Sequence, residues 1–267
     1  EAIAITNVDG RVIGGGVGGF AAFLVAVVAL AVLAASAQAQ QRRIALVIGN
    51  DDYENVPKLE KAVNDAEAVA RHLTDIGFTV TLAKNIGRRA TSRAVVEFEK
   101  QVQQGDLALF YFAGHGYSVS GQDFLLPVDI WEAGAGEESM VREEGFMPTA
   151  FAARLLRAGA STPILILDAC RNNPFEQAGK RSIGGNSGLA NQPLGEGIFV
   201  LYSAGQYQSA LDGMGPGDDN PNSVFTRALL REFGKPNASM VDIAKATQVA
   251  VRDMASQIGH VQLPSYY

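Results

Sequence analysis

Short apolar runs alternate along the chain with longer stretches in which apolar residues recur every three or four positions. The apolar runs predict buried strands at residues 44–49, 78–82, 107–112, 163–168 and 197–202. The periodic stretches predict helices at residues 62–73, 91–105, 149–158, 224–233 and 241–256, with Thr91 as the N-cap of the second helix. Because each strand is apolar throughout and helices separate the strands, we expect an α/β fold. Its mostly parallel sheet of about six strands should have helices on both faces.

Two residues with reactive side chains lie at the carboxyl ends of two predicted strands. The third strand leads into Gly114-His115-Gly116, and the fourth leads into Asp168-Ala169-Cys170. In an open parallel sheet the ligand crevice lies beyond the carboxyl ends of the strands, so we expect His115 and Cys170 side by side there. An imidazole next to a thiol accepts its proton or stabilises the thiolate, and glycines let backbone N–H groups approach a developing oxyanion. The sequence therefore predicts a catalytic Cys–His pair.

Each member of this pair also has an ordinary structural alternative. Cys170 is the only cysteine, which excludes an intrachain disulfide but is also compatible with a small buried side chain. His115 alone is compatible with a core histidine that is hydrogen-bonded to a carbonyl group. The position of both residues at the ends of strongly apolar strands favours catalysis. A metal site is disfavoured, because the other two histidines, His72 and His260, lack ligand spacing.

Residues 1–40 differ from the rest of the chain. Residues 12–39 carry no charge and are mainly apolar, and they end with the small residues Ala37 and Ala39 separated by one position. This layout is typical of a secretory signal that is cleaved after Ala39, and it predicts an exported, periplasmic or secreted protein. The alternative is an uncleaved membrane anchor through residues 14–35, because the apolar run is long enough to span a bilayer.

Composition limits the classes of function. The whole chain has 47% hydrophobic and 19% charged residues, and residues 41–267 suit one domain with a sizeable core. The formal net charge of −6 argues against a nucleic-acid-binding protein, which usually presents a basic face. Residues 177–197 are rich in Gly, Asn, Ser and Gln and show no apolar period, which predicts a long mobile or functional loop.

Several segments together resemble the bacterial branch of the caspase and metacaspase family of cysteine peptidases (clan CD). The segments are Ile48–Tyr53, Asn64–Ala66, Tyr111–Gly116, Asp168–Phe175, Tyr202–Ala204 and Asn222–Thr226. The caspase signature Gln-Ala-Cys-X-Gly has a histidine about 50 residues upstream. Here the motif is Asp-Ala-Cys-Arg-Asn, and His115 lies 55 residues before Cys170. The resemblance covers residues 43–264 and implies a caspase-hemoglobinase fold.

The resemblance also implies a division of the domain and a mechanism. The division is into a large-subunit-like part, a linker loop and a small-subunit-like part, at residues 41–176, 177–197 and 198–267. Cys170 is then the nucleophile of an endopeptidase that forms a thioester acyl-enzyme, with His115 as general acid and base. The backbone N–H groups of Gly116 and Cys170 form the oxyanion hole. This mechanism requires no cofactor or metal.

The departure from the caspase signature changes the expected specificity. In metacaspases an Asp two residues before the cysteine and an Asp on the first helix bind Arg or Lys, and Asp168 and Asp65 match these positions. Two carboxylates suit a guanidinium fork or an ammonium group. Animal caspases carry a Ser-aromatic-Arg run that holds a substrate aspartate, whereas the counterpart here, Ser209-Ala210-Leu211, has no cation. The resemblance therefore implies protein or peptide substrates that are cleaved after Arg or Lys.

Three further expectations concern regulation and activity. The pair Lys180-Arg181 lies in the linker loop and is a candidate autocleavage site for such a protease. Some metacaspases depend on calcium, for which Asp212, Asp218 and Asp219 are candidate ligands. The segment lacks EF-hand spacing, so a solvated loop is the simpler interpretation. A caspase-like fold can also lose activity, and a catalytically inactive interaction module is therefore the alternative function.

Overall fold

The structure, a computed structural model, describes residues 41–131, 133, 137–170, 197–205 and 208–267, and of Cys170 it describes the backbone only. These residues belong to one unit, Gln41–Tyr267. The predicted signal or anchor segment and the predicted autocleavage pair Lys180-Arg181 lie outside the described residues, so both stay predictions. Within the described ranges, no helix combines the length and the apolar character that crossing a membrane requires.

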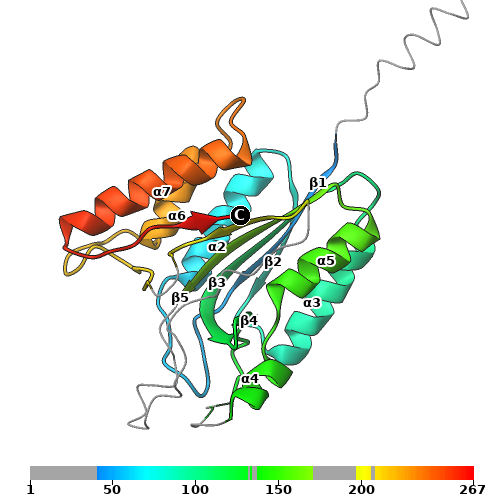
Figure 1. Cartoon of the computed structure of the whole chain (residues 1–267), viewed down its shortest axis with the longest axis horizontal. Helices are drawn as coiled ribbons and strands as arrows, with labels where there is room; N and C mark the ends of the chain where they lie inside the picture. Colours follow the sequence, from blue (N-terminus) through cyan, green and yellow to red (C-terminus); the bar gives the residue numbers. More distant parts are fainter. Residues whose placement is uncertain (1–40, 132, 134–136, 171–196, 206–207) are drawn as a thin grey trace, which may run out of the picture. The chain divides into compact units, whose positions relative to one another are not determined.

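A seven-stranded sheet with the strand order β2-β1-β3-β5-β6-β7 forms the centre of this unit, and β4 pairs with β3 outside that order (Figure 1). The strands are β1 (Arg43–Gly49), β2 (Thr79–Lys84), β3 (Leu107–Val119), β4 (Gln122–Leu125), β5 (Thr162–Cys170), β6 (Phe199–Tyr202) and β7 (Ser265–Tyr266). All pairings from β2 to β6 are parallel, and only β4 and β7 pair in the antiparallel direction. The predicted mostly parallel sheet is confirmed.

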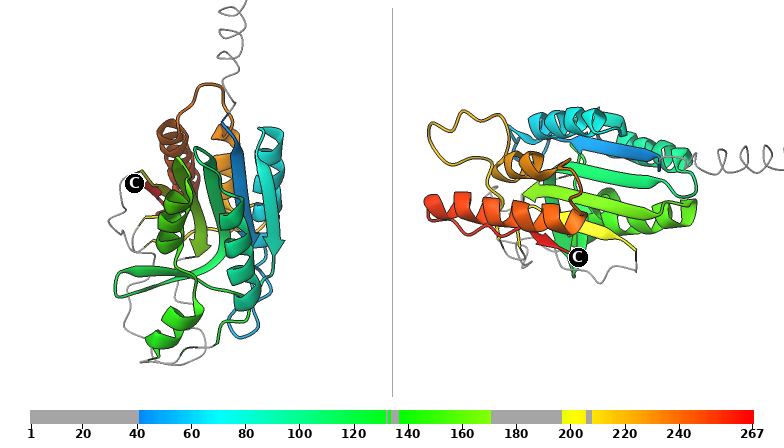
Figure 2. Two further views of the ribbon diagram at one scale, coloured as in Figure 1. Left: turned by 90° about the vertical axis from the view of Figure 1, so that its right-hand side faces the viewer. Right: turned by 90° about the horizontal axis from the view of Figure 1, so that it is seen from above.

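Helices cover both faces of the sheet (Figures 1 and 2). One face carries α2 (Ala62–Asp75), α6 (Val224–Glu232) and α7 (Met240–Gln257), and the other carries α3 (Arg88–Gln101) and α5 (Pro148–Ala158). A short helix, α4 (Glu138–Glu144), packs through Val141 against the β3–β4 hairpin. The predicted α/β fold is therefore confirmed.

The central strands are buried on both faces, which is why their sequences show no polar alternation. In β1, Val47 packs in a cluster with Leu73 of α2 and Phe225 of α6. The preceding residue, Leu46, points to the other face and packs in a cluster with Phe98 of α3. Two apolar clusters on opposite faces thus fix the sheet and, with it, the positions of its strand ends.

The structure contains three short elements that the apolar pattern did not predict: β4, β7 and α4. β3 and β4 are joined by a tight turn in which Ser120 and Gly121 have φ angles of 49° and 76°. Positive φ at both central residues is typical of the two-residue turns of hairpins. A strand of four residues and one of two residues are too short for a period to be visible, but Ser-Gly is a turn signal in the sequence.

The prediction that Thr91 caps the second helix is wrong. α3 begins three residues earlier, at Arg88, with Gly87 as N-cap, and the Thr91 hydroxyl donates to the Gly87 carbonyl oxygen at 3.0 Å. A distant side chain satisfies the first turn instead, because Asp129 Oδ1 accepts from the Arg88 N–H group at 2.7 Å. A cap supplied from outside the helix has no local sequence signal. The helix also ends at Gln101, before the predicted end.

Candidate active site

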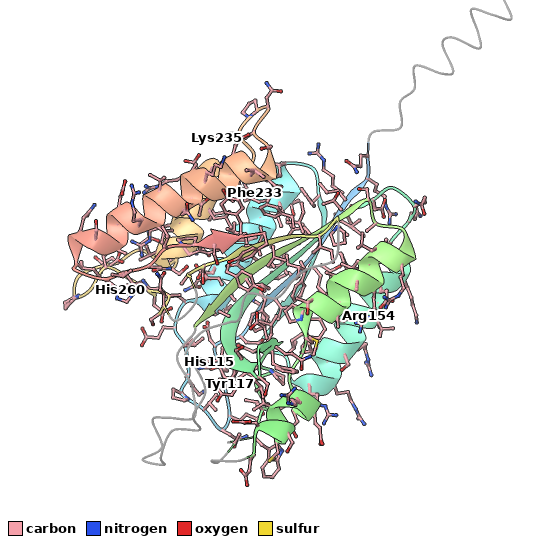
Figure 3. All side chains as sticks on the ribbon, in the orientation of Figure 1. His115, Tyr117, Arg154, Phe233, Lys235 and His260 are labelled. Carbon is pink, nitrogen blue, oxygen red and sulfur yellow. The ribbon has the colours of Figure 1, made fainter. Side chains whose placement is uncertain are left out.

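The backbones of His115 and Cys170 lie next to each other at the carboxyl end of the sheet. β3 does not end before His115, as the sequence pattern suggested, but continues through it to Val119. β5 runs parallel to β3 as far as Cys170, and the register pairs the Cα atoms of His115 and Cys170. The part of β3 that continues into the hairpin carries His115 and Tyr117 (Figure 3). Two parallel strands thus bring together residues that are 55 positions apart in the sequence.

The imidazole of His115 is buried and held in one orientation. Its exposed fraction is 6%, and its Nε2 atom lies 2.7 Å from the carbonyl oxygen of Pro57. Because a carbonyl oxygen only accepts, Nε2 carries the proton and Nδ1 carries the lone pair. Among the described residues Nδ1 has no hydrogen-bond partner. Burial lowers the pKa of His115, and the contact with Pro57 opposes this shift, so the neutral imidazole is favoured.

The direction of the Gly116 N–H group can be inferred from the hydrogen bonds of its neighbours on β3. Ala113, on β3, accepts through its carbonyl oxygen from Asn50 N, on the β1 side. His115 accepts from Leu126 N on the same side, at 2.9 Å. Groups along a strand alternate in direction, so Gly116, which faces Leu125 in the next pair, should form no hydrogen bond with it. Its N–H group is therefore directed away from β4, to the side on which Cys170 pairs with His115.

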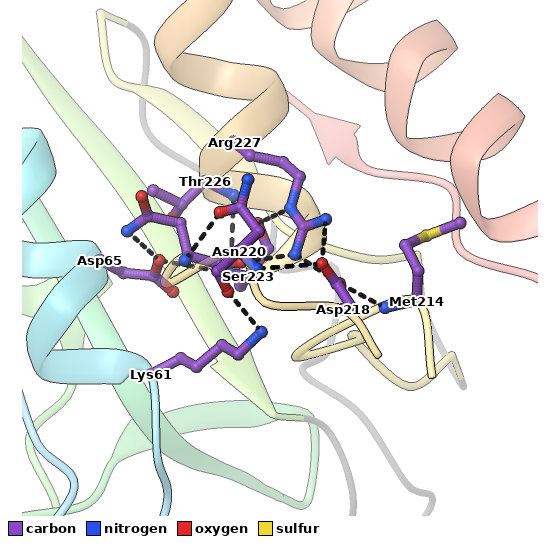
Figure 4. Close-up of polar contacts among 9 residues, drawn as sticks. Lys61, Asp65, Met214, Asp218, Asn220, Ser223, Thr226 and Arg227 are labelled. Carbon is purple, nitrogen blue, oxygen red and sulfur yellow. Dashed lines mark hydrogen bonds and ion pairs between the residues drawn. The ribbon is translucent and has the colours of Figure 1, made fainter. Parts of the chain in front are cut away.

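The two predicted substrate-binding carboxylates, Asp65 and Asp168, meet around Ser223. Asp65, on α2, is 2% exposed and accepts from Asn222 Nδ2 and from the Ser223 N–H group, both at 2.9 Å (Figure 4). Asp168, on β5, accepts from Ser223 Oγ at 2.7 Å and from Thr226 Oγ1 at 3.1 Å. Ser223 is also the N-cap of α6. The start of this helix thus contacts both acids.

No cation of the described residues forms an ion pair with either carboxylate. Burial raises the pKa of Asp168 to about 6, and hydrogen bonds such as that from Ser223 oppose this shift. Burial, followed by the charge of Asp168, raises the pKa of Asp65 well above its usual range. Two buried acids held only by neutral donors are costly to ionise, which is why the pKa values of both are raised.

A comparison with known protein families matches the caspase domain (Peptidase_C14) over residues 42–267. The chain belongs to the caspase domain family. The human mucosa-associated lymphoid tissue lymphoma translocation protein 1 is 34% identical over 87 residues, which is 33% of this chain and 11% of the human protein. The mouse homolog of that protein is also 34% identical over 87 residues, which is 33% of this chain and 10% of the mouse protein. The matched part therefore spans about a tenth of either relative.

Family membership identifies the fold as that of a cysteine peptidase, and it confirms the family resemblance found in the sequence. In the sequence, the segment Asn222–Thr226 resembles the family but indicates no role for its members. The structure assigns Ser223 and Thr226 to the support of Asp168. Pro57 was missed altogether, because it contacts His115 through its backbone carbonyl and a backbone group leaves no residue-type signal.

The aspartates that were candidate calcium ligands lie in different surroundings. Asp218 forms two hydrogen bonds with the Arg227 guanidinium, at 3.2 and 2.7 Å, which hold its pKa well below the usual range. The Asp212 residue is exposed overall. Desolvation of its carboxylate by the surrounding atoms raises its pKa, and the positive charge of Lys61 offsets part of this shift. In the described part of the chain no three His, Cys, Asp or Glu side chains are grouped for a metal ion. Calcium activation stays a prediction.

Proposed function

We propose that this caspase-family domain is a cysteine endopeptidase that cleaves peptide bonds after Arg or Lys. The observation that carries the proposal is the pair of buried carboxylates, Asp65 and Asp168, which have no cationic partner among the described residues. Asp168 lies two residues before Cys170 on β5, at the strand ends where His115 pairs with Cys170. A substrate cation bound by the two acids would thus lie close to the proposed nucleophile.

The proposed reaction begins with transfer of the Cys170 Sγ proton to Nδ1 of His115, whose Nε2 is occupied by Pro57. The thiolate attacks the substrate carbonyl carbon, and the oxyanion accepts hydrogen bonds from the N–H groups of Gly116 and Cys170. Breaking of the C–N bond leaves a thioester, and the leaving amine takes the proton from Nδ1. His115 then removes a proton from water, which hydrolyses the thioester and restores the thiol.

The proposed specificity follows from charge and geometry. A guanidinium group presents several donors in one plane, which suits two carboxylates better than one. Ser223 donates a hydrogen bond to Asp65 and another to Asp168, so their positions are set before a substrate arrives. The exposed Asp212 acts electrostatically on Asp168 and adds negative charge that is accessible from solvent. This charge would favour the approach of a cationic side chain toward Asp168.

Peptides that differ only in the residue before the scissile bond test this function. We expect cleavage after Arg and Lys and little cleavage after Asp or after citrulline, the neutral analogue of Arg. The ratio of kcat/KM for the Arg peptide to that for the citrulline peptide should fall as the pH is lowered through about 6, because protonation of Asp168 removes negative charge. Arg keeps its charge throughout, and the titration of the catalytic pair cancels in the ratio. A preference for Asp, or a ratio independent of pH, would contradict the assignment.

Autocleavage after Lys180 or Arg181 is a further proposal that follows from this specificity. Incubation of the purified chain should produce two fragments that meet at one of these residues, and mass spectrometry would identify the ends. Replacing both residues by glutamine should abolish the fragments. If the fully active enzyme consists only of intact chain, processing at this pair is not part of activation.

A further inference from the structure

We propose that Tyr53 is a positioning residue that fixes both the backbone and the ring of His115, an inference that rests on the proposed catalytic role of His115. Tyr53 lies in the segment between β1 and α2, residues 50–61, and its exposed fraction is 1%. No part of this side chain takes part in the reaction steps described above. It packs in an apolar cluster with Tyr117 and Leu126, and it contacts both the backbone and the ring of His115.

The hydroxyl group of Tyr53 is inserted into a backbone ladder. Leu126 N donates directly to the His115 carbonyl oxygen at 2.9 Å. In a regular antiparallel pair the His115 N–H group would donate back to Leu126. Here Tyr53 Oη accepts from His115 N at 2.8 Å and donates to the Leu126 carbonyl oxygen at 3.1 Å. The hydroxyl therefore takes the place of one backbone hydrogen bond and holds the strand open at His115.

The ring of Tyr53 also packs against the imidazole. The two ring centroids are 4.6 Å apart, with an angle of 53° between the planes. Gly114 makes room for this arrangement, because a Cβ atom at Gly114 would lie 2.6 Å from Tyr53 Oη. Pro57, four residues after Tyr53, accepts from Nε2 of the same imidazole. One loop thus holds the histidine at its backbone, at one ring face and at one ring nitrogen.

The loop that carries Tyr53 is itself anchored at both ends. Asp51 accepts from the N–H groups of Ala62 and Val63 at the start of α2, at 2.8 and 3.0 Å. Asn85, which follows β2, accepts through Oδ1 from Asp51 N at 2.8 Å. These bonds fix the loop to two elements of the core, so the position of Tyr53 does not depend on a substrate.

Removal of the hydroxyl has a specific consequence for His115. Without Oη, the His115 N–H group and the Leu126 carbonyl group either stay unpaired or close into a direct bond. A direct bond draws the β3 backbone at His115 toward β4 and away from β5, where Cys170 lies, whereas unpaired groups no longer hold it in place. A displacement of about 1 Å in a catalytic group lowers the rate by about two orders of magnitude.

The test is Tyr53→Phe, compared with Tyr202→Phe, which removes another buried hydroxyl that donates to Asp123. For Tyr53→Phe we expect kcat to fall about 10- to 100-fold with KM within about twofold, and the acid limb of the pH profile to shift. Tyr202→Phe should leave kcat and the pH profile close to those of the parent. Active-site titration corrects each rate for the folded fraction.

The tautomer of His115 gives a readout that does not need activity. In ¹⁵N NMR spectra the parent should show a single Nε2-protonated form, and Tyr53→Phe should show a mixture of forms, because the displaced backbone moves Nε2 away from the Pro57 carbonyl that fixes the tautomer. If Tyr53→Phe does not fold, Gly114→Ala keeps the hydroxyl but displaces it, and the same changes are expected. An unchanged tautomer with a loss of kcat no larger than in Tyr202→Phe would overturn the inference. A parent with the single tautomer but no peptidase activity would overturn the proposed function and leave the positioning of His115 standing.

Discussion

Replacing Cys170 by alanine should lower kcat/KM for an Arg-ending peptide by about 10⁴-fold or more, because the variant lacks the only group that can form the thioester. Losses of this size are typical when the nucleophile of a covalent mechanism is removed. Cys170 is the only cysteine of the chain, so no other thiol can substitute for it. The proposed cation pocket is unchanged in this variant, and the Arg peptide should still bind. The measurement is steady-state hydrolysis together with direct binding of the same peptide.

A covalent inhibitor with an Arg side chain and a thiol-reactive group provides the control. It should add its mass to the parent at the peptide that contains Cys170 and leave Cys170→Ala unmodified. Undiminished hydrolysis by Cys170→Ala would contradict the mechanism. A folded parent that is neither labelled nor active on any basic peptide would favour the alternative, a caspase-like interaction module without catalysis.

The sheet could be predicted from the sequence because its central strands are continuously apolar. Val47 and Leu46 face opposite clusters, and a strand buried on both sides leaves the apolar run that marks it. The start of α3 could not be predicted, because Asp129 caps it from a distant segment. β7 has two residues and depends on its partner β6, so no local pattern identifies it.

The residues of the candidate site also fall into two groups, those with a local sequence signal and those without one. His115 and Cys170 are predictable because reactive side chains at strand ends are a local signal. The parallel register of β3 and β5 then places their backbones next to each other. Asp65 lies on the buried face of an amphipathic helix, where a carboxylate is unexpected, and only the family resemblance gave it a role. Tyr53 and Pro57 act through a hydroxyl inserted in a ladder and a backbone carbonyl. Such contacts exist only once the strands are paired.

Replacing Asp168 by asparagine should lower kcat/KM for the Arg peptide by about 30- to 5,000-fold, which corresponds to the roughly 2–5 kcal/mol lost when one partner of a buried charge pair is removed. Hydrolysis of the citrulline peptide should change little, so the preference for Arg collapses. Asparagine retains an oxygen that can accept from Ser223 and Thr226, which keeps the start of α6 in place.

The stability of Asp168→Asn separates a binding role from a structural one. In the folded protein the pKa of Asp168 is raised to about 6 from 3.8, chiefly by burial, so folding favours the protonated form. In the parent protein the Asp168 carboxylate therefore lowers the free energy of unfolding above about pH 6. This stability is regained as the pH falls from about 6 toward 3.8. Asp168→Asn carries no such charge and should be at least as stable as the parent near pH 7, despite its loss of activity.

Asp106→Asn is the matched control, because Asp106 is also buried but has a cationic partner. It is 2% exposed and pairs with Arg42 at 2.8 Å, and its carboxylate also accepts from Gln103 N. This substitution should lower the melting temperature and leave the preference for Arg intact, the reverse of the result for Asp168→Asn. If Asp168→Asn instead lost stability and kept its preference for Arg, the buried acids would serve the fold, and the cation pocket would have to lie elsewhere.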